Sequence, residues 1–196
     1  MTRGRPLAFD PDRAINAAME TFWSHGYQAT SMRELLDAMA ISRSSLYQAF
    51  GSKEQLFLEA LRRYRDGLMS RLHRQLDTAP SGLAFVEGLF RETGACAGTE
   101  RAALGCLIFN SASELGQREG LPSQHAAQSV AAITELFYQA VSRAQAEGDV
   151  AADRDARALA HYLTLGMAGL RTLLKSGIDP AQAEQTVELL LQTLRQ

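Results

Sequence analysis

Apolar residues recur at intervals of three and four over most of this chain, which is the period of an amphipathic helix. The pattern is densest between residues 30 and 53, where two short stripes follow each other. The first stripe comprises Met32, Leu35, Leu36 and Met39, and the second contains Leu46 and Phe50. Ser31 and Ser42 stand just before the two stripes, where a hydroxyl can cap a helix. We therefore predict two short helices joined by a tight turn.

A further helix is expected on each side of this pair. Residues 10–25 begin with Asp10, a capping residue, and Pro11, which suits the first helical position. Gly26 can end this helix in left-handed backbone. After the cap residue Ser52, one apolar stripe continues from residue 53 to about residue 77. The predicted core of the N-terminal helices is an aromatic cluster of Phe22, Trp23, Phe50 and Phe57.

The segment from Thr78 to Gly82 interrupts the helical pattern and marks a domain boundary. Beyond it, helices are expected at about 81–97, 101–117, 123–147, 153–176 and 180–195. No stretch of alternating apolar and polar residues predicts a strand. The expected fold class is all-α. It has an arm and helix-turn-helix unit at 1–52, a connecting helix at 53–77 and a C-terminal bundle at 78–196.

Polar residues collect on the outer face of the second short helix. This face carries Arg43, Ser44, Ser45, Tyr47 and Gln48. Small hydrogen-bonding groups beside one guanidinium suit the DNA major groove, where polar side chains read base edges and phosphates. Near the N-terminus, Arg3 and Arg5 lie in a segment that Pro6 favours as extended, and such an arm can enter a narrow minor groove. A solvated tail explains the arm equally well.

The run from Ser31 to Glu54, SMRELLDAMAISRSSLYQAFGSKE, resembles the DNA-binding domain of TetR-family transcriptional regulators. Its most specific part is I-S-x-x-x-L-Y-x-x-F-x-S-K-E, which begins at Ile41. The resemblance implies base contacts from Arg43, Ser44, Ser45 and Gln48. It implies phosphate contacts from Thr30, Arg33, Tyr47 and Lys53. Departures from the family's usual residues occur at Ala40 and Ser44, where glycine is frequent, and at Ala49, where histidine is frequent.

Two predicted helices of the C-terminal part, 123–147 and 153–176, carry wide apolar faces with small residues. In the second, Gly166 and Gly169 permit close approach of another helix. Composition alone explains these faces equally well by packing within one chain or by pairing with a second copy. The resemblance favours a homodimer built on both helices, and two-fold symmetry then implies a palindromic operator on double-stranded DNA.

The resemblance also implies a repressor that leaves its operator when the C-terminal domain binds an effector, with the connecting helix as the lever. Candidate lining residues of the effector pocket are Phe85, Leu89, Phe90, Phe109, Phe137 and Tyr162, with Asn110, Ser113 and His161 as polar groups. Ordinary core packing is the competing interpretation for each of them. The mixture of side chains predicts a small, largely apolar effector.

Cys106 is a candidate thiol sensor. The run GCLIFNSASEL around it resembles a helix found in one branch of TetR-type regulators, some of which respond to electrophiles or oxidants. Sensing requires a partly exposed thiol whose thiolate is stabilised by a helix N-terminus or a cation, and Cys106 lies near a predicted helix start. The competing interpretation is a small, buried and inert cysteine packed beside Gly105.

Composition adds broad limits. The 196 residues are 46% hydrophobic and 21% charged, with a formal net charge of −2. Residues 1–77 hold 11 basic and 9 acidic side chains, a net of +2, and residues 78–196 hold 9 and 13, a net of −4. This asymmetry has the sign expected for DNA binding at the N-terminal end.

Motifs of catalysis and cofactor binding are missing from the sequence. There is no Gly-rich phosphate loop, G-x-S-x-G elbow or H-E-x-x-H, and the four histidines are scattered. Cys96 and Cys106 lack metal-ligand spacing. We therefore expect no enzyme, no cofactor and no metal. No apolar run reaches the roughly 20 residues that span a bilayer, so we expect a cytoplasmic protein without a membrane partner. The remaining alternative is a helical adaptor that binds proteins but not DNA.

Overall fold

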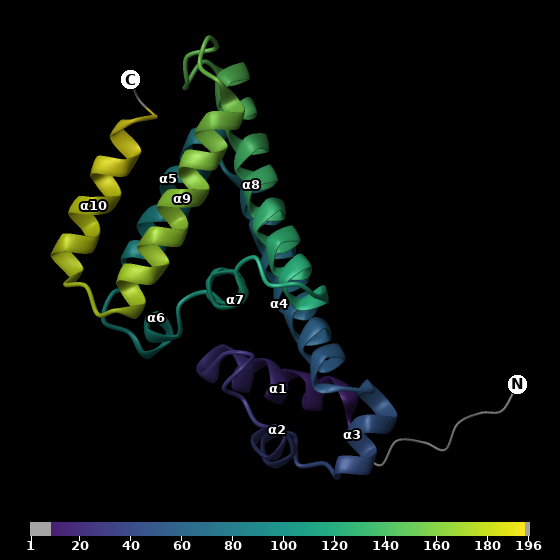
Figure 1. The fold of residues 1–196 in the computed structure, drawn as a ribbon. Coiled ribbons are helices and arrows are strands. Elements are labelled where there is room, and N and C mark those ends of the chain that lie inside the picture. The colour runs from purple at the N-terminus through teal and green to yellow at the C-terminus, as the bar shows by residue number, and fades with distance from the viewer. Residues whose placement is uncertain (1–8, 195–196) are drawn as a thin grey trace, which may run out of the picture.

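The computed structural model describes residues 9–194 of the chain (Figure 1). In this part the chain forms helices and no strands, which confirms the all-α prediction. The helices are α1 (Pro11–His25), α2 (Met32–Met39), α3 (Arg43–Phe50), α4 (Lys53–Thr78), α5 (Gly82–Gly94), α6 (Glu100–Leu104), α7 (Leu107–Leu115), α8 (Leu121–Glu147), α9 (Ala156–Lys175) and α10 (Pro180–Gln192). The expected arm with Arg3 and Arg5 lies outside the described residues.

Helices α1, α2 and α3 gather at one end of the molecule (Figure 1) and, with the start of α4, form what we call the head. Their starts follow from local sequence. Asp10 caps α1, and Ser31 and Glu34 form both hydrogen bonds of a capping box at α2. The hydroxyl of Ser42 accepts the backbone N–H of Ser45 at 3.1 Å. The predicted helix starts are therefore confirmed.

The core of the head contains the fully buried side chains of Phe22, Leu35, Leu46 and Phe57. The rings of Phe22 and Phe57 meet edge to face, with centroids 5.2 Å apart. The prediction is wrong for Trp23 and Phe50, which are only partly buried. Trp23 packs against Tyr64 of α4 at 5.0 Å between ring centroids, and the Phe50 ring lies 6.3 Å from that of Phe9. One step along a helix turns a side chain by about 100°, so Trp23 cannot share the face of Phe22.

The turn between α2 and α3 keeps a glycine-like geometry although its residue is alanine. Ala40 has φ 53° and ψ 42°, in the left-handed region, and ends α2. The backbone N–H of Ile41 donates to the Leu36 carbonyl at 3.3 Å across this turn. A left-handed residue with a Cβ costs about 1–2 kcal/mol, so the turn is strained at this position.

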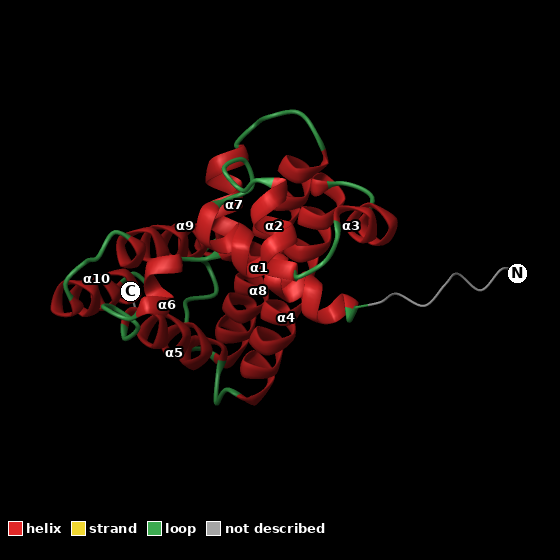
Figure 2. Cartoon of the chain, turned by 90° about the horizontal axis from the view of Figure 1, so that it is seen from below, coloured by secondary structure: helices red, strands yellow, loops and turns green. Residues whose placement is uncertain are grey.

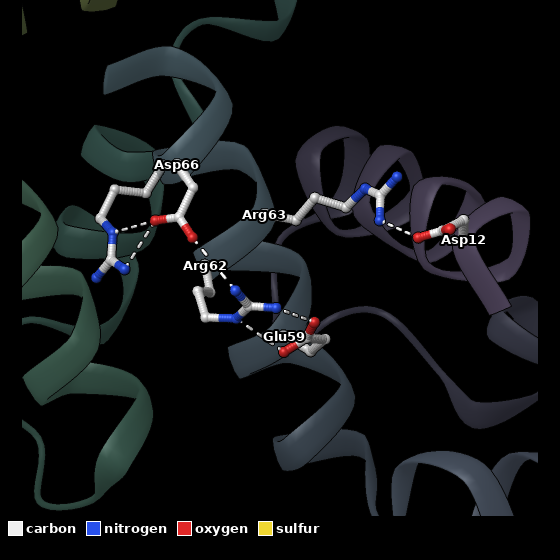
Figure 3. Close-up of polar contacts among 6 residues, drawn as sticks. Asp12, Glu59, Arg62, Arg63 and Asp66 are labelled. Atoms are coloured by element: carbon white, nitrogen blue, oxygen red, sulfur yellow. Dashed lines mark hydrogen bonds and ion pairs between the residues drawn. The ribbon is translucent and has the colours of Figure 1, made fainter. Parts of the chain in front are cut away.

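Helix α4 has 26 residues and extends roughly 39 Å from the head along α8 (Figure 1). Its first turns belong to the head. The Arg63 guanidinium of α4 donates to the Asp12 carboxylate of α1 at 2.5 Å (Figure 3). On the neighbouring face, Arg62 pairs with Glu59 and Asp66 within α4. These exposed pairs orient α4 more than they stabilise it.

The remaining helices form the body, in which α8 packs against α4, α5, α7 and α9, while α10 lies outermost beside α5 and α9 (Figures 1 and 2). The predicted helix 101–117 is wrong in one respect, because it is broken at Gly105, whose φ is 68°. The Asn110 side-chain amide donates to the Leu104 carbonyl at 2.8 Å and closes the end of α6. Within residues 9–194, no helix is both long and apolar enough to cross a bilayer.

Candidate nucleic-acid interface and effector cavity

Helix α3 lies at the outer end of the head (Figures 1 and 2), and most of its polar side chains are exposed. Leu46 is completely buried and anchors the inner face. Arg43, Ser44 and Gln48 are exposed, whereas Ser45 is half-buried. The hydroxyls of Ser44 and Ser45 lie 2.8 Å and 2.9 Å from the Ser42 hydroxyl, so both are held by the cap. Arg43 and Gln48 are the groups on this face that can reach furthest toward a base edge.

Two predicted phosphate ligands also face solvent. Tyr47 is 48% exposed although it is a large aromatic residue. Arg33 on α2 is exposed over 91% of its side chain and has only a long contact of 3.8 Å with Asp37, one helical turn away. Exposed pairs of this kind bind weakly, so Arg33 can change partner at little energetic cost.

The expected phosphate contact of the Thr30 side chain is contradicted by its burial. Thr30 is 1% exposed, and its hydroxyl donates to the Gly26 carbonyl at 2.6 Å. That hydrogen bond closes the loop between α1 and α2. The side chain therefore supports the start of α2 from inside the head.

Lys53 begins α4 and is tied to the same loop. Its ammonium donates to the Gln28 carbonyl at 3.3 Å and lies 4.8 Å from the centroid of the Tyr27 ring. Partial burial lowers the pKa of Lys53, and the carboxylates of Glu114 and Glu34 oppose that effect. A cation at a helix N-terminus is unfavourable unless an anion joins it, so this position suits a phosphate.

One contact of the body reaches the head beside Lys53. The Glu114 carboxylate of α7 accepts the backbone N–H groups of Tyr27 at 2.9 Å and Gln28 at 2.7 Å. Gly26 leaves room for it, because a Cβ at that position would stand 2.8 Å from a Glu114 oxygen. We call this pair of hydrogen bonds the α7 strut. It fixes the loop between α1 and α2 to the C-terminal end of α7.

A cavity of about 190 Å³ lies at the other end of α7, between head and body. Apolar side chains from α4, α5, α8 and α9 border it together with polar and charged side chains, and Trp23 of α1 is also part of its lining. Its lining residues include Trp23, Tyr64, Arg71, Gln75, Leu89, Glu92, Cys96, Arg101, Cys106, Phe109, Phe137, Met167 and Arg171. A second hollow shares Trp23, Tyr64 and Arg71 and extends the opening between α1 and α4.

Three of the predicted lining residues, Leu89, Phe109 and Phe137, do border this cavity. Phe85 and Phe90 do not, because both are buried in the packing of α5. Tyr162 faces α10, where its hydroxyl donates to the Leu190 carbonyl at 3.1 Å. The sequence shows that these aromatic residues are apolar, but not which neighbouring helix each one meets.

The predicted polar lining is wrong for all three residues. Asn110 is used at the break between α6 and α7. Ser113 and His161 are exposed on the outer faces of α7 and α9. The polar groups that do line the cavity were missed, since Arg71, Arg101 and Arg171 stand at positions that resemble the ordinary solvent face of an amphipathic helix.

The surroundings of Cys106 agree in part with a thiol sensor and in part with a buried, inert cysteine. Cys106 is 5% exposed, it is the N-cap residue of α7, and its sulfur borders the cavity. The Tyr64 hydroxyl donates to Cys106 Sγ at 3.6 Å. Burial, with a further contribution from Cys106, raises the pKa of Tyr64. Cys96 borders the same cavity. Within the described part of the chain, no cluster of His, Cys, Asp or Glu could hold a metal ion.

Both halves of the chain match known families. Residues 14–60 match the family described as bacterial regulatory proteins, tetR family, and residues 82–190 match tetracyclin repressor-like, C-terminal domain. The chain therefore belongs to the TetR family of DNA-binding transcriptional regulators. The helix-turn-helix of α2 and α3 lies within the part that matches the N-terminal family.

Individual relatives cover almost the whole chain. It is 31% identical to the HTH-type transcriptional repressor ComR of Escherichia coli (strain K12), over 99% of this chain and 91% of ComR. It is 30% identical to the HTH-type transcriptional regulator YezE of Bacillus subtilis (strain 168), over 97% and 99%. A cysteine mutant of the TetR-family regulator CifR, complexed with 26-bp double-strand operator DNA, is 35% identical, with a TM-score of 0.84 over 97% of this chain and 100% of CifR.

Proposed function

We propose that this protein is a cytoplasmic, homodimeric repressor that binds a palindromic operator through α3 and leaves it when an effector occupies the cavity. The observation that carries the proposal is the outer face of α3. A capped helix anchored by Leu46 holds Arg43, Tyr47 and Gln48 in solvent at the end of the head. ComR is a repressor, and the CifR structure contains operator DNA. Both support the same role here.

The roles of the residues follow from their surroundings. Arg43 and Gln48 contact base edges, and Ser44 and Ser45 complete the contact surface from the cap of α3. Arg33, Tyr47 and Lys53 hold phosphates and set the register on the duplex. Thr30 shapes the loop from within. Arg3 and Arg5 remain candidates for the minor groove.

Operator titrations at several salt concentrations test these roles. Arg43→Ala should weaken binding to the operator by about 1–3 kcal/mol and should weaken binding to unrelated DNA less. Lys53→Ala should weaken both and reduce the salt slope by about one. Arg74→Ala removes an equal charge from an exposed side chain near the end of α4 that lies away from the head (Figure 1), and is the matched control. Equal effects of Arg43→Ala and Arg74→Ala would refute the assignment of α3.

The proposed dimer uses α9 and α10 in place of the expected pair 123–147 and 153–176. The apolar face expected on the first of these helices, now α8, is buried inside the same chain. In contrast, Leu165 on α9 is 72% exposed and Leu189 on α10 is 65% exposed. Gly166 already packs against Leu190, which brings α9 and α10 close together. An exposed apolar face of this kind suits a second copy of the chain.

Light scattering after gel filtration tests this interface. Leu165→Arg and Leu189→Arg should convert the dimer to a monomer and abolish operator binding at nanomolar concentrations. Leu121→Arg changes a leucine that is 49% exposed at the start of α8 and should leave the dimer intact. A dimer that survives both α9 and α10 substitutions would exclude this interface.

Release requires that an effector favour a head position that does not fit DNA. Two elements connect the cavity with the head. Helix α4 lines the cavity and continues into the head, and α7 borders the cavity at Cys106 and Phe109 and ends in the strut at Glu114. An occupant that displaces α7 by a small distance therefore moves the loop that holds Lys53.

A reactive effector can act on the same cavity through Cys106. Its thiol borders the cavity, and the Tyr64 hydroxyl can donate a hydrogen bond to the thiolate. Alkylation with iodoacetamide should abolish operator binding of the wild-type protein and spare Cys106→Ser. Cys96→Ser is the control for the second thiol at the cavity. Equal loss of binding in wild type and Cys106→Ser would remove Cys106 as the sensor.

A further inference from the structure

We infer that the cavity binds a small amphipathic carboxylate, with its apolar part against α5 and α8 and its carboxylate toward Arg71, Arg101 and Arg171. The inference rests on the proposed function, in that it names the chemical class of the effector. It also changes the expectation of a largely apolar effector. Three sets of observations carry it: the charges at the wall, two buried polar atoms, and the apolar side of the cavity.

The charges at the wall are predominantly positive. Arg71 of α4 and Arg101 of α6 stand exposed at the opening, and Arg171 of α9 is half-buried. Among the residues described, none of the three has a carboxylate within ion-pair distance. Some arginines on outer faces of the molecule, such as Arg62 and Arg91, do form ion pairs. Glu92 is the single acidic residue at this wall within the described chain.

Arg171 is placed to receive an anion. Its guanidinium donates to the Thr93 hydroxyl at 3.4 Å, a long bond that leaves its remaining N–H groups available. Arg101 stacks over the Trp23 ring, with 5.8 Å from Cζ to the ring centroid. The three guanidinium groups come from three different helices. A carboxylate accepts two parallel N–H groups from a guanidinium, which is the strongest form of this recognition.

Two buried polar atoms at the same wall have no hydrogen-bond partner in the described residues. They are Nε1 of Trp23 and Oε1 of Gln75. The Trp23 N–H can only donate, so it requires an acceptor such as a ligand oxygen. The side-chain N–H of Gln75 donates to Glu92 at 3.5 Å, and its Oε1 can accept only from a ligand that also carries a hydroxyl or N–H group. A buried polar group without a partner is unfavourable, and a carboxylate oxygen in the cavity would satisfy the Trp23 N–H.

Apolar side chains also line the cavity and determine the rest of the ligand. They include Leu89, Phe109, Phe137 and Met167, all of which are wholly or partly buried. A ligand with an apolar body and one carboxylate therefore meets complementary groups at both of its ends. Because Trp23 belongs to the head and the other lining residues to α4 and the body, such a ligand contacts both parts at once.

The experiment compares ligands that differ only in charge. Octanoate, benzoate and phenylacetate are titrated into the wild-type dimer beside their primary amides, with calorimetry and Trp23 fluorescence as readouts. Trp23 is the single tryptophan of the chain, so its emission reports on this cavity. At least one acid should bind 10-fold or more tightly than its amide. Equal binding of every acid and its amide, or binding of none of the acids, would overturn the inference.

Variants locate the site. Arg71→Gln and Arg171→Gln should each weaken binding of the acid about 10- to 100-fold and leave amide binding unchanged. Arg74→Gln, one turn further along α4 and bonded to Ser70, is the matched control. Acid binding that is unaffected by both cavity substitutions would also overturn the inference. Circular dichroism confirms folding, and the acid–amide comparison on the wild type needs no variant.

Operator release is measured separately, so that the two proposals can fail independently. If an acid binds with the expected arginine dependence but leaves the operator complex intact, the carboxylate site stands and the effector role of the cavity fails. If release is driven by alkylation of Cys106 while no acid binds, the effector role stands and the carboxylate site fails.

Discussion

The α7 strut permits a quantitative prediction about the joint between head and body. Glu114→Ala removes the acceptor of two backbone N–H groups, those of Tyr27 and Gln28. Hydrogen bonds to a charged group contribute about 1.5–3 kcal/mol each when they are buried. One of these bonds is partly buried and the other is exposed, so the lower end of that range applies to each. The expected loss is about 2–3 kcal/mol in the free energy of unfolding.

The assay combines thermal unfolding with hydrogen exchange. For a protein of this size, 1 kcal/mol shifts Tm by about 2–4 °C, so Glu114→Ala should lower Tm by about 4–12 °C. Amide exchange should accelerate at Tyr27 and Gln28 far more than in α8 or α9. Operator affinity should also fall, because the loop that positions Lys53 loses its support.

The control is Glu119→Ala, which removes the same charge in the loop after α7, where Glu119 is exposed. Its Tm should stay within about 2 °C of the wild type. If Glu114→Ala and Glu119→Ala unfold at the same temperature, or if Tyr27 and Gln28 exchange at the wild-type rate, the strut does not couple α7 to the head. Weakened operator binding with unchanged exchange would likewise contradict the reasoning.

Two further predictions concern α2. Ala40→Gly should raise the free energy of unfolding by about 0.5–1 kcal/mol, because relief of left-handed strain exceeds the entropy cost of glycine. Ala38→Gly, in the last turn of the same helix, should lower it by a similar amount in urea titrations, and a loss at both positions would exclude strain at Ala40. Hydrogen bonds from Ser31 lower the pKa of Glu34 below its usual 4.5. A carboxyl group whose pKa is lower in the folded than in the unfolded protein stabilises the fold above the unfolded pKa, and this contribution disappears as pH falls through the folded pKa. When pH is lowered from about 6 to 3, the Tm of Glu34→Gln should therefore fall less than the Tm of the wild type. Parallel plots of Tm against pH for the two proteins would show that the capping box does not cause this pH dependence.

The head could be predicted closely because its determinants are local. Ser31, Ser42 and Ser52 cap their helices through backbone groups only three residues away. The same proximity explains why the polar face of α3 is visible in the sequence, since Leu46 identifies the buried side of an eight-residue helix. Thr30 was misplaced because its partner, the Gly26 carbonyl, depends on how the loop between α1 and α2 folds back.

The body could be predicted only as a set of apolar helices. Periodicity shows that a helix has an apolar face, but it does not show whether that face meets its own chain, a cavity or a second copy. For that reason the interface was expected on 123–147 and 153–176, whereas the two most exposed leucines, Leu165 and Leu189, stand on α9 and α10. The break at Gly105 was missed because a glycine inside an apolar run is also tolerated within a continuous helix.

The sequence alone determined the helical class, the capped helix-turn-helix and the exposed polar side chains of α3, since each depends on residues within one or two helical turns. Tertiary structure decided the cavity and its charge. Trp23, Arg71, Arg101 and Arg171 come from four helices and meet only when head and body pack together. The strut from Glu114 to Tyr27 spans 87 residues of sequence. Long-range contacts of this kind depend on the packing of whole helices, which no local pattern encodes.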